Sequence, residues 1–110
     1  MSADRVETLQ AMLFEQPRDT FLHYALATEY RLLGKSREAL EQYNQILEID
    51  PGYKGVYLHL ASLYAETGDP DNARKTYLKG LMITMASGDD HAYRELQAAY
   101  AGFEDWGEDE

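Results

Sequence analysis

The sequence predicts an all-α fold of stacked antiparallel helix pairs. The first observation is a period of 34 residues, which is typical of stacked repeats. The second is apolar residues at helical spacing throughout, with no strand-like alternation. Each repeat buries its apolar face only against its neighbours, so about six helices should form a helical solenoid. The repeated positions are Leu26, Ala27, Tyr30, Gly34, Ala39, Tyr43, Leu47 and Ile49, which recur as Leu60, Ala61, Tyr64, Gly68, Ala73, Tyr77, Leu81 and Ile83.

The first half of the chain contains signals for three helices. Helical spacing predicts the first over residues 3–16, with Pro17 just beyond its end. The second should begin at Asp19 or Thr20 and end at Gly34, which can adopt the left-handed conformation that closes a helix. The third should begin at Ser36 and stop at residues 50–52, because the residue before a proline disfavours the helical conformation.

The second half repeats these signals. A fourth helix is predicted from about residue 54 to residue 67, followed by Gly68. Asp69 and Pro70 then form a strong start signal for a fifth helix, which should reach about residue 86. A sixth helix is expected from about residue 90 to residue 101.

The spacing resembles the tetratricopeptide repeat, whose 34-residue unit reads W-x2-L-G-x2-Y, A-x3-F and P. One copy reads His23, Leu26, Ala27, Tyr30, Ala39, Tyr43 and Pro51, and the next reads Tyr57, Leu60, Ala61, Tyr64, Ala73, Tyr77 and Met85. The first half of the motif returns as Tyr93, Leu96, Gln97 and Tyr100, and the second half precedes as Leu9, Met12, Leu13 and Pro17. The predicted domain therefore covers residues 1–103, with a half-repeat at 1–17, repeats at 20–53 and 54–87, a half-repeat at 90–103 and an acidic tail at 104–110.

The resemblance implies a right-handed superhelix with specific core positions. Ala27 and Ala61 should lie where the two helices of a repeat cross, with Ala39 and Ala73 on the opposing helices. A larger side chain there would push the helices apart. Tyrosines should fill the space between repeats, and these are Tyr30, Tyr43, Tyr64 and Tyr77.

Composition limits the possible partners and environment. The net charge is −10, half of it from five acids in the last seven residues, so nucleic acid should be repelled. The chain has no cysteine, no apolar run long enough to span a membrane and no secretory signal at its start. These features predict a cytoplasmic protein that binds neither nucleic acid nor membrane.

No pattern in the chain indicates catalysis, a cofactor or a metal site. His23, His59 and His91 lack the spacing of a metal-ligating motif, and no nucleophile elbow or phosphate-binding loop is present. The sequence Asp89-Asp90-His91 lies at a predicted helix start, where capping explains it better than ligation. We therefore expect no catalytic residues, no metal and no cofactor.

The resemblance implies that the first helix of each repeat lines a concave, partner-binding face. The candidate residues on this face are Tyr24, Thr28, Arg31, Leu58, His59 and Ser62. The predicted function is a protein–protein interaction scaffold that holds a peptide or partner helix with a basic or apolar face. The alternative is a self-assembling module, so that the chain would be a monomer or a weak homodimer.

The C-terminal segment leaves two alternatives open. Phe103 and Trp106 lie among acidic residues after the last predicted helix. They could fold back over the exposed end of the array, which we expect for Phe103, with disorder beyond Trp106. Alternatively, they could form a free acidic–aromatic peptide that another protein recognises.

Overall fold

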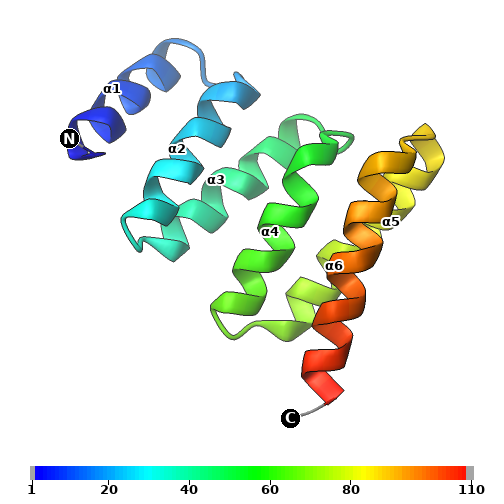
Figure 1. Ribbon diagram of the computed structural model, residues 1–110. Coiled ribbons are helices and arrows are strands. Elements are labelled where there is room, and N and C mark those ends of the chain that lie inside the picture. Colours follow the sequence, from blue (N-terminus) through cyan, green and yellow to red (C-terminus); the bar gives the residue numbers. More distant parts are fainter. Residues whose placement is uncertain (1, 109–110) are drawn as a thin grey trace. The chain divides into compact units, whose positions relative to one another are not determined.

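The computed structural model describes residues 2–108, and the chain forms six helices and no strand within that range (Figure 1). This confirms the predicted all-α class. None of the helices in the described range is long and apolar enough to cross a membrane. The helices are α1 (Ser2–Glu15), α2 (Thr20–Leu32), α3 (Ser36–Ile49), α4 (Lys54–Glu66), α5 (Pro70–Ser87) and α6 (Asp90–Glu108).

The predicted start and stop signals act as expected. The Asp19 carboxylate accepts a hydrogen bond from the backbone N–H of Leu22 at 3.1 Å, which caps α2. Asp69 caps α5 in the same way, with Pro70 at the first turn of the helix. Glycines with φ of 75°, 83° and 74° follow α2, α4 and α5, and they are Gly34, Gly68 and Gly88.

The chain divides into two compact units, of which the first ends at Tyr53 and contains α1, α2 and α3. Connections of three or four residues join these helices, and α2 packs against both of its neighbours. Ala27 and Ala39 are fully buried, in agreement with their predicted role at a helix crossing. The other buried apolar residues of this unit are Leu22, Leu26, Tyr30, Tyr43 and Ile46.

Helix α1 is attached to α2 partly through polar contacts. Arg5 forms an ion pair with Glu29 at 2.8 Å, and the Gln10 side-chain amide donates a hydrogen bond to the Tyr30 hydroxyl at 2.9 Å. The Glu29 side chain is only 6% exposed, whereas that of Arg5 is 70% exposed. No residue of α1 whose side chain the structure describes is buried. The attachment of α1 therefore depends on a buried carboxylate that needs its cationic partner.

The second unit, from Lys54 onward, contains α4, α5 and α6. Ala61 and Ala73 are fully buried in it, as predicted, and Tyr77 is 4% exposed, whereas Tyr64 is only partly buried. Helix α6 packs against both α4 and α5. The remaining buried apolar residues are Val56, Tyr57, Leu60, Leu63 and Leu96.

Gly80 lies on α5 where α4 and α6 both come close to its backbone. A Cβ atom placed on Gly80 would fall 2.7 Å from Tyr57 Cβ on α4 and 3.1 Å from Leu96 Cδ1 on α6. Real Cβ atoms do not approach other atoms so closely, so only a glycine fits here without a shift of the neighbouring helices.

Helix α6 is longer than the sequence predicts. It runs to Glu108 instead of ending near residue 101, so Phe103 lies on a continuous helix and does not fold back on a loop. Gly102 does not interrupt it, because its backbone does not have the positive φ of a helix-ending glycine. The predicted disorder beyond Trp106 is wrong for residues 107 and 108, which are helical. The Trp106 side chain and residues 109–110 lie outside the described part of the chain.

Candidate functional site

In the first unit, the three candidate residues lie on α2, one or two helical turns apart. Tyr24 and Arg31 are half-buried and Thr28 is exposed. The Thr28 hydroxyl donates a hydrogen bond to the Tyr24 carbonyl at 3.0 Å, so part of its bonding capacity is used within the helix. The rings of Tyr24 and Tyr43 on α3 form a T-shaped contact, with 6.2 Å between ring centroids. This contact holds the tyrosine in place on the surface.

The electrostatics of this patch keep Tyr24 neutral. Burial raises the pKa of Tyr24 above its ordinary value of 10.0, and the nearby hydroxyls of Tyr43 and Tyr53 raise it further. The positive charge of Arg31 acts in the opposite direction. The patch therefore offers a neutral phenol, which can donate and accept hydrogen bonds, close to a permanent positive charge.

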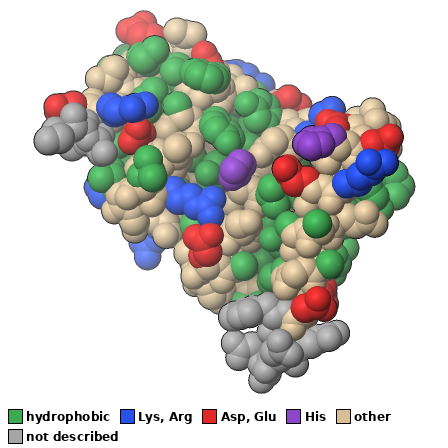
Figure 2. All heavy atoms as spheres, in the orientation of Figure 1, with side chains coloured by type: hydrophobic (Ala, Val, Ile, Leu, Met, Phe, Trp, Pro, Cys, Tyr) green, Lys and Arg blue, Asp and Glu red, His purple; other side chains and the backbone are tan. Residues whose placement is uncertain are grey.

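In the second unit, Leu58, His59 and Ser62 lie on α4 and all three are half-buried. Ser62 lines an open cavity of about 340 Å³, but Leu58 and His59 do not. Figure 2 shows hydrophobic side chains between α4 and α6 on this face. The residues that line the cavity come from all three helices of the unit and are Ser62, Ala65, Glu66, Tyr77, Ala99 and Phe103.

An aromatic cluster stiffens one wall of this cavity. The rings of Tyr77 and Phe103 lie 5.5 Å apart, and Tyr100 lies 5.7 Å from the first and 6.2 Å from the second. The Arg74 guanidinium lies 5.5 Å from the centre of the Phe103 ring, within range of a cation–π contact. The same group donates a hydrogen bond from Nε to Glu104 at 3.0 Å. Side chains fixed in this way lose little entropy when a ligand binds.

The hydrogen bond from Arg74 holds the pKa of Glu104 below its ordinary value of 4.5, with a further contribution from Tyr100. In return, Glu104 raises the pKa of Arg74. Both groups are therefore charged at neutral pH, and they fasten the C-terminal part of α6 to α5.

The three histidines occupy unlike positions. His23 is 8% exposed, with Nδ1 2.7 Å from Gln42 Oε1 and Nε2 2.8 Å from the Pro17 carbonyl oxygen, so both ring nitrogens are occupied. His59 is half-buried and His91 is exposed. Among the residues that the structure describes, no three His, Asp or Glu side chains are grouped so that they could hold a metal ion.

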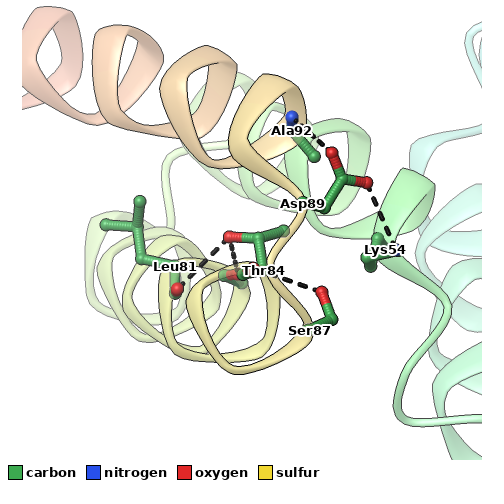
Figure 3. Close-up of polar contacts among 7 residues, drawn as sticks. Lys54, Leu81, Thr84, Ser87, Asp89 and Ala92 are labelled. Atoms are coloured by element: carbon green, nitrogen blue, oxygen red, sulfur yellow. Dashed lines mark hydrogen bonds and ion pairs between the residues drawn. The ribbon is translucent and has the colours of Figure 1, made fainter.

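Asp89 caps α6, as predicted for the acidic cluster at this helix start. Its carboxylate accepts a hydrogen bond from the Ala92 N–H at 3.0 Å and forms an ion pair with Lys54 at 3.2 Å (Figure 3). These two contacts lower the pKa of Asp89 below its ordinary value of 3.8, with the bond from Ala92 the larger cause. The carboxylate therefore has a structural role, because it joins the starts of α4 and α6 within the unit.

Sequence reasoning missed most of the cavity and the buried carboxylate of Glu29. The periodicity correctly predicts Tyr77 as a core residue, but it does not show that this residue also lines a cavity. The predicted end of the last helix near residue 101 leaves Phe103 outside that helix, whereas α6 includes it. Glu29 did leave a signal, because it lies on the stripe of buried α2 residues that also contains Leu22 and Leu26. A carboxylate in such a stripe predicts a cationic partner.

Comparisons with known proteins agree with this architecture. The family profile of the tetratricopeptide repeat matches residues 31–100. The tetratricopeptide repeat and J domain-containing co-chaperone DNJ1 of Fusarium oxysporum is 34% identical over 79 residues. That match covers 66% of this chain but only 15% of the co-chaperone, so the chain spans a small part of that protein.

Two solved structures are also similar. A tetratricopeptide repeat domain protein from Salinibacter ruber is 35% identical, with a TM-score of 0.72 over 78% of this chain and 96% of that one. PcrH, solved in complex with the chaperone binding region of PopD, has a TM-score of 0.84 over 96% of this chain and 80% of its own, at 18% identity. The second likeness shows the fold alone. The chain therefore belongs to the tetratricopeptide repeat family, whose repeats are non-enzymatic modules of protein–protein interaction.

Proposed function

We propose that this chain binds a peptide or a partner helix on the first helices of its repeats. The observation that carries the proposal is the cavity bordered by α4, α5 and α6, with its fixed aromatic wall. Protein-binding hot spots are usually a few rigid aromatic or arginine side chains beside a pocket. Tyr77 and Phe103 provide such a wall, and Ser62 and Glu66 provide its polar rim.

The chemistry of the cavity indicates the kind of partner. Its lining is mainly apolar, which suits a single apolar side chain of the partner. The exposed Glu66 carries negative charge beside that apolar surface. A basic residue next to the inserted apolar side chain would therefore be favoured, in agreement with the partner expected from the sequence.

Tyr24 and Arg31 on α2 offer a second set of contacts. The prediction that they share one concave groove with Leu58, His59 and Ser62 rests on the 34-residue period and remains a prediction. The complex of PcrH with a region of PopD supports the proposal only to the extent that a fold of this kind can hold part of another protein.

The proposal can be tested by selecting peptides from a displayed library on the wild-type chain and measuring their affinity by calorimetric titration. Ser62→Arg should block the cavity and weaken the selected peptides at least ten-fold, because a long charged side chain would occupy the space. Tyr24→Ala combined with Arg31→Ala should weaken any peptide that also reaches α2.

The matched control is Gln45→Ala combined with Glu48→Ala, two exposed positions on α3. This variant should bind as the wild type does. If Ser62→Arg binds its peptides with unchanged affinity, then the cavity is not the binding site and the proposal fails.

A self-assembling module is the second candidate, favoured by exposed apolar side chains in the first unit. Phe14 is 86% exposed, Leu32 is 75% exposed and Phe21 is 70% exposed. Sedimentation equilibrium distinguishes the two functions, because a scaffold for other proteins should sediment as a monomer. A dimer that Phe14→Ser and Phe21→Ser dissociate would support self-assembly.

A further inference from the structure

Helix α5 has an unusual solvent-facing surface, which we call the α5 outer face. Its apolar members have four-residue and three-residue spacing, which places them on one side of the helix. Met82 is 71% exposed, Met85 is 65% exposed and Leu78 is 44% exposed, and two exposed lysines lie beside them. The α5 outer face consists of Lys75, Leu78, Lys79, Met82 and Met85.

The preceding repeat provides an internal comparison for this surface. Helix α3 is the equivalent helix, and its residues 34 positions earlier are also exposed. There the chain has a polar and acidic surface, as is normal for a solvated helix. The equivalents of the first four members lie on α3, whereas the equivalent of Met85 is Pro51, just beyond the end of that helix. The four α3 residues are Glu41, Asn44, Gln45 and Glu48. The same place in the repeat has therefore changed from acidic and polar on α3 to basic and apolar on α5.

The charge of α5 differs from that of the rest of the chain. It contains three basic residues and one acidic residue, whereas none of the other five helices in the described range has a basic excess. Arg74 is engaged by Glu104. Lys75 and Lys79 have no ion-pair partner among the side chains that the structure describes, which are those of residues 4–105. A local positive surface on a chain of net charge −10 favours a ligand with complementary negative charge.

We propose that the α5 outer face docks an acidic amphipathic helix of a partner protein. The two methionines are flexible and polarizable, which suits contact with an apolar helix stripe. The two lysines would pair with carboxylates along one edge of that stripe. The face covers 11 positions, which is about 15 Å of helix, so about three turns of the partner would contact it.

The charge of the whole chain favours this partner over two other occupants. An anionic membrane surface is large enough to interact with the charge of the whole chain. The net charge of −10 would repel that surface more strongly than Lys75 and Lys79 would attract it. A second copy of the chain carries the same net charge, so its docking on the α5 outer face is opposed as well. A short acidic helix contacts only the α5 outer face, so its attraction to the lysines is the larger effect.

The test uses a synthetic fluorescent helical peptide with leucines four and seven residues apart and glutamates along one flank. A control peptide has lysines in place of the glutamates. The acidic peptide should show saturable binding by fluorescence anisotropy, with at least ten-fold higher affinity than the control. The first variant gives α5 the surface of α3, by Lys75→Glu, Leu78→Asn, Lys79→Gln and Met82→Glu, and it should lower the affinity at least ten-fold.

The reciprocal variant gives α3 the surface of α5 and should create a second site. Calorimetry should then show two acidic peptides bound per chain instead of one. Both variants change only exposed residues, and circular dichroism melting verifies that they fold. The substitutions in the reciprocal variant are Glu41→Lys, Asn44→Leu, Gln45→Lys and Glu48→Met.

Three results would overturn the proposal. One is equal binding of the acidic peptide to the wild type and the first variant. Another is that the acidic peptide does not bind, whereas the wild-type chain binds phosphatidylserine vesicles but not phosphatidylcholine vesicles. If the first variant abolishes that vesicle binding, the α5 outer face binds a membrane instead of a protein. The third is a dimer in sedimentation that the first variant dissociates, which would indicate a second copy. Ser62→Arg should leave binding of this peptide unchanged, so the proposal can fail or stand independently of the cavity.

Discussion

Replacement of Gly80 by alanine should destabilise the protein, although alanine is the better helix former. In an exposed helix interior this change would stabilise by about 1 kcal/mol. Here the new Cβ would lie 2.7 Å from Tyr57 Cβ and 3.1 Å from Leu96 Cδ1. The Tyr57 Cβ is attached to the backbone of α4 and cannot rotate away, so the helices must move apart. Overpacking costs about 1–3 kcal/mol, and a contact this close between two backbone-attached atoms belongs in the upper part of that range, about 2–3 kcal/mol. After the gain of about 1 kcal/mol in helix propensity, a net loss of about 1–2 kcal/mol remains.

The assay is urea unfolding and thermal melting of the variant beside a matched control. Gly102→Ala is the same chemical change on α6, where a new Cβ meets no atom within 4 Å. This control should gain up to about 1 kcal/mol, because only helix propensity changes. The melting temperature of Gly80→Ala should fall by about 5–10 °C, at roughly 5 °C per kcal/mol for a chain of this size. A Gly80→Ala protein that melts at or above the wild-type temperature would refute the packing argument.

Three further changes test other parts of the structure. Ala61→Leu should destabilise the second unit by about 1–3 kcal/mol in urea unfolding, since Ala61 is fully buried, and an unchanged midpoint would mean that the predicted helix crossing is wrong. Asp89 and Glu104 have lowered pKa values in the folded state, so both carboxylates stabilise that state when the pH is above their ordinary pKa values of 3.8 and 4.5. This stabilisation is lost as the pH falls through their folded-state pKa values. The double variant Asp89→Asn with Glu104→Gln should therefore lose less stability between pH 6 and pH 3 than the wild type, and equal acid sensitivity would contradict this. Arg5→Ala should speed amide hydrogen exchange in the first helix by leaving Glu29 buried and unpaired, whereas Arg5→Lys should exchange more nearly as the wild type does.

Local chemistry explains why most of the fold could be predicted from the sequence. Asp19, Asp69 and Gly88 act through bonds to their own neighbours in the chain, and these bonds depend on residue type and spacing. The buried alanines could be predicted because the 34-residue period places Ala27 and Ala61 in equivalent packing environments. Such features require no knowledge of distant contacts.

The length of α6 could not be predicted in this way. Residues 102–108 are rich in acids and glycine, which locally favour the end of a helix. Contacts from α5 outweigh that preference, because Arg74 binds Glu104 and Tyr77 packs against Phe103. Both pairs are far apart in sequence and become neighbours only after α6 has docked.

The same distinction applies to the candidate site. Helical spacing was sufficient to place Tyr24, Thr28 and Arg31 on α2 and Leu58, His59 and Ser62 on α4. It could not show which of them lines a cavity, because that depends on the side chains of α5 and α6. Of the six, only Ser62 lines the cavity of the second unit.

His23 constrains how this sequence can change over time. It occupies the position of the family's aromatic residue, yet its ring bridges the carbonyl of Pro17 and the side chain of Gln42. A phenylalanine introduced at position 23 alone would leave the Pro17 carbonyl and the Gln42 side chain without this hydrogen-bond partner. An apolar residue introduced first at position 42 would leave one nitrogen of the His23 imidazole without its partner. Either single step passes through a less stable protein. Positions 23 and 42 should therefore change as a pair, and the effect of each substitution should depend on whether the other has already occurred.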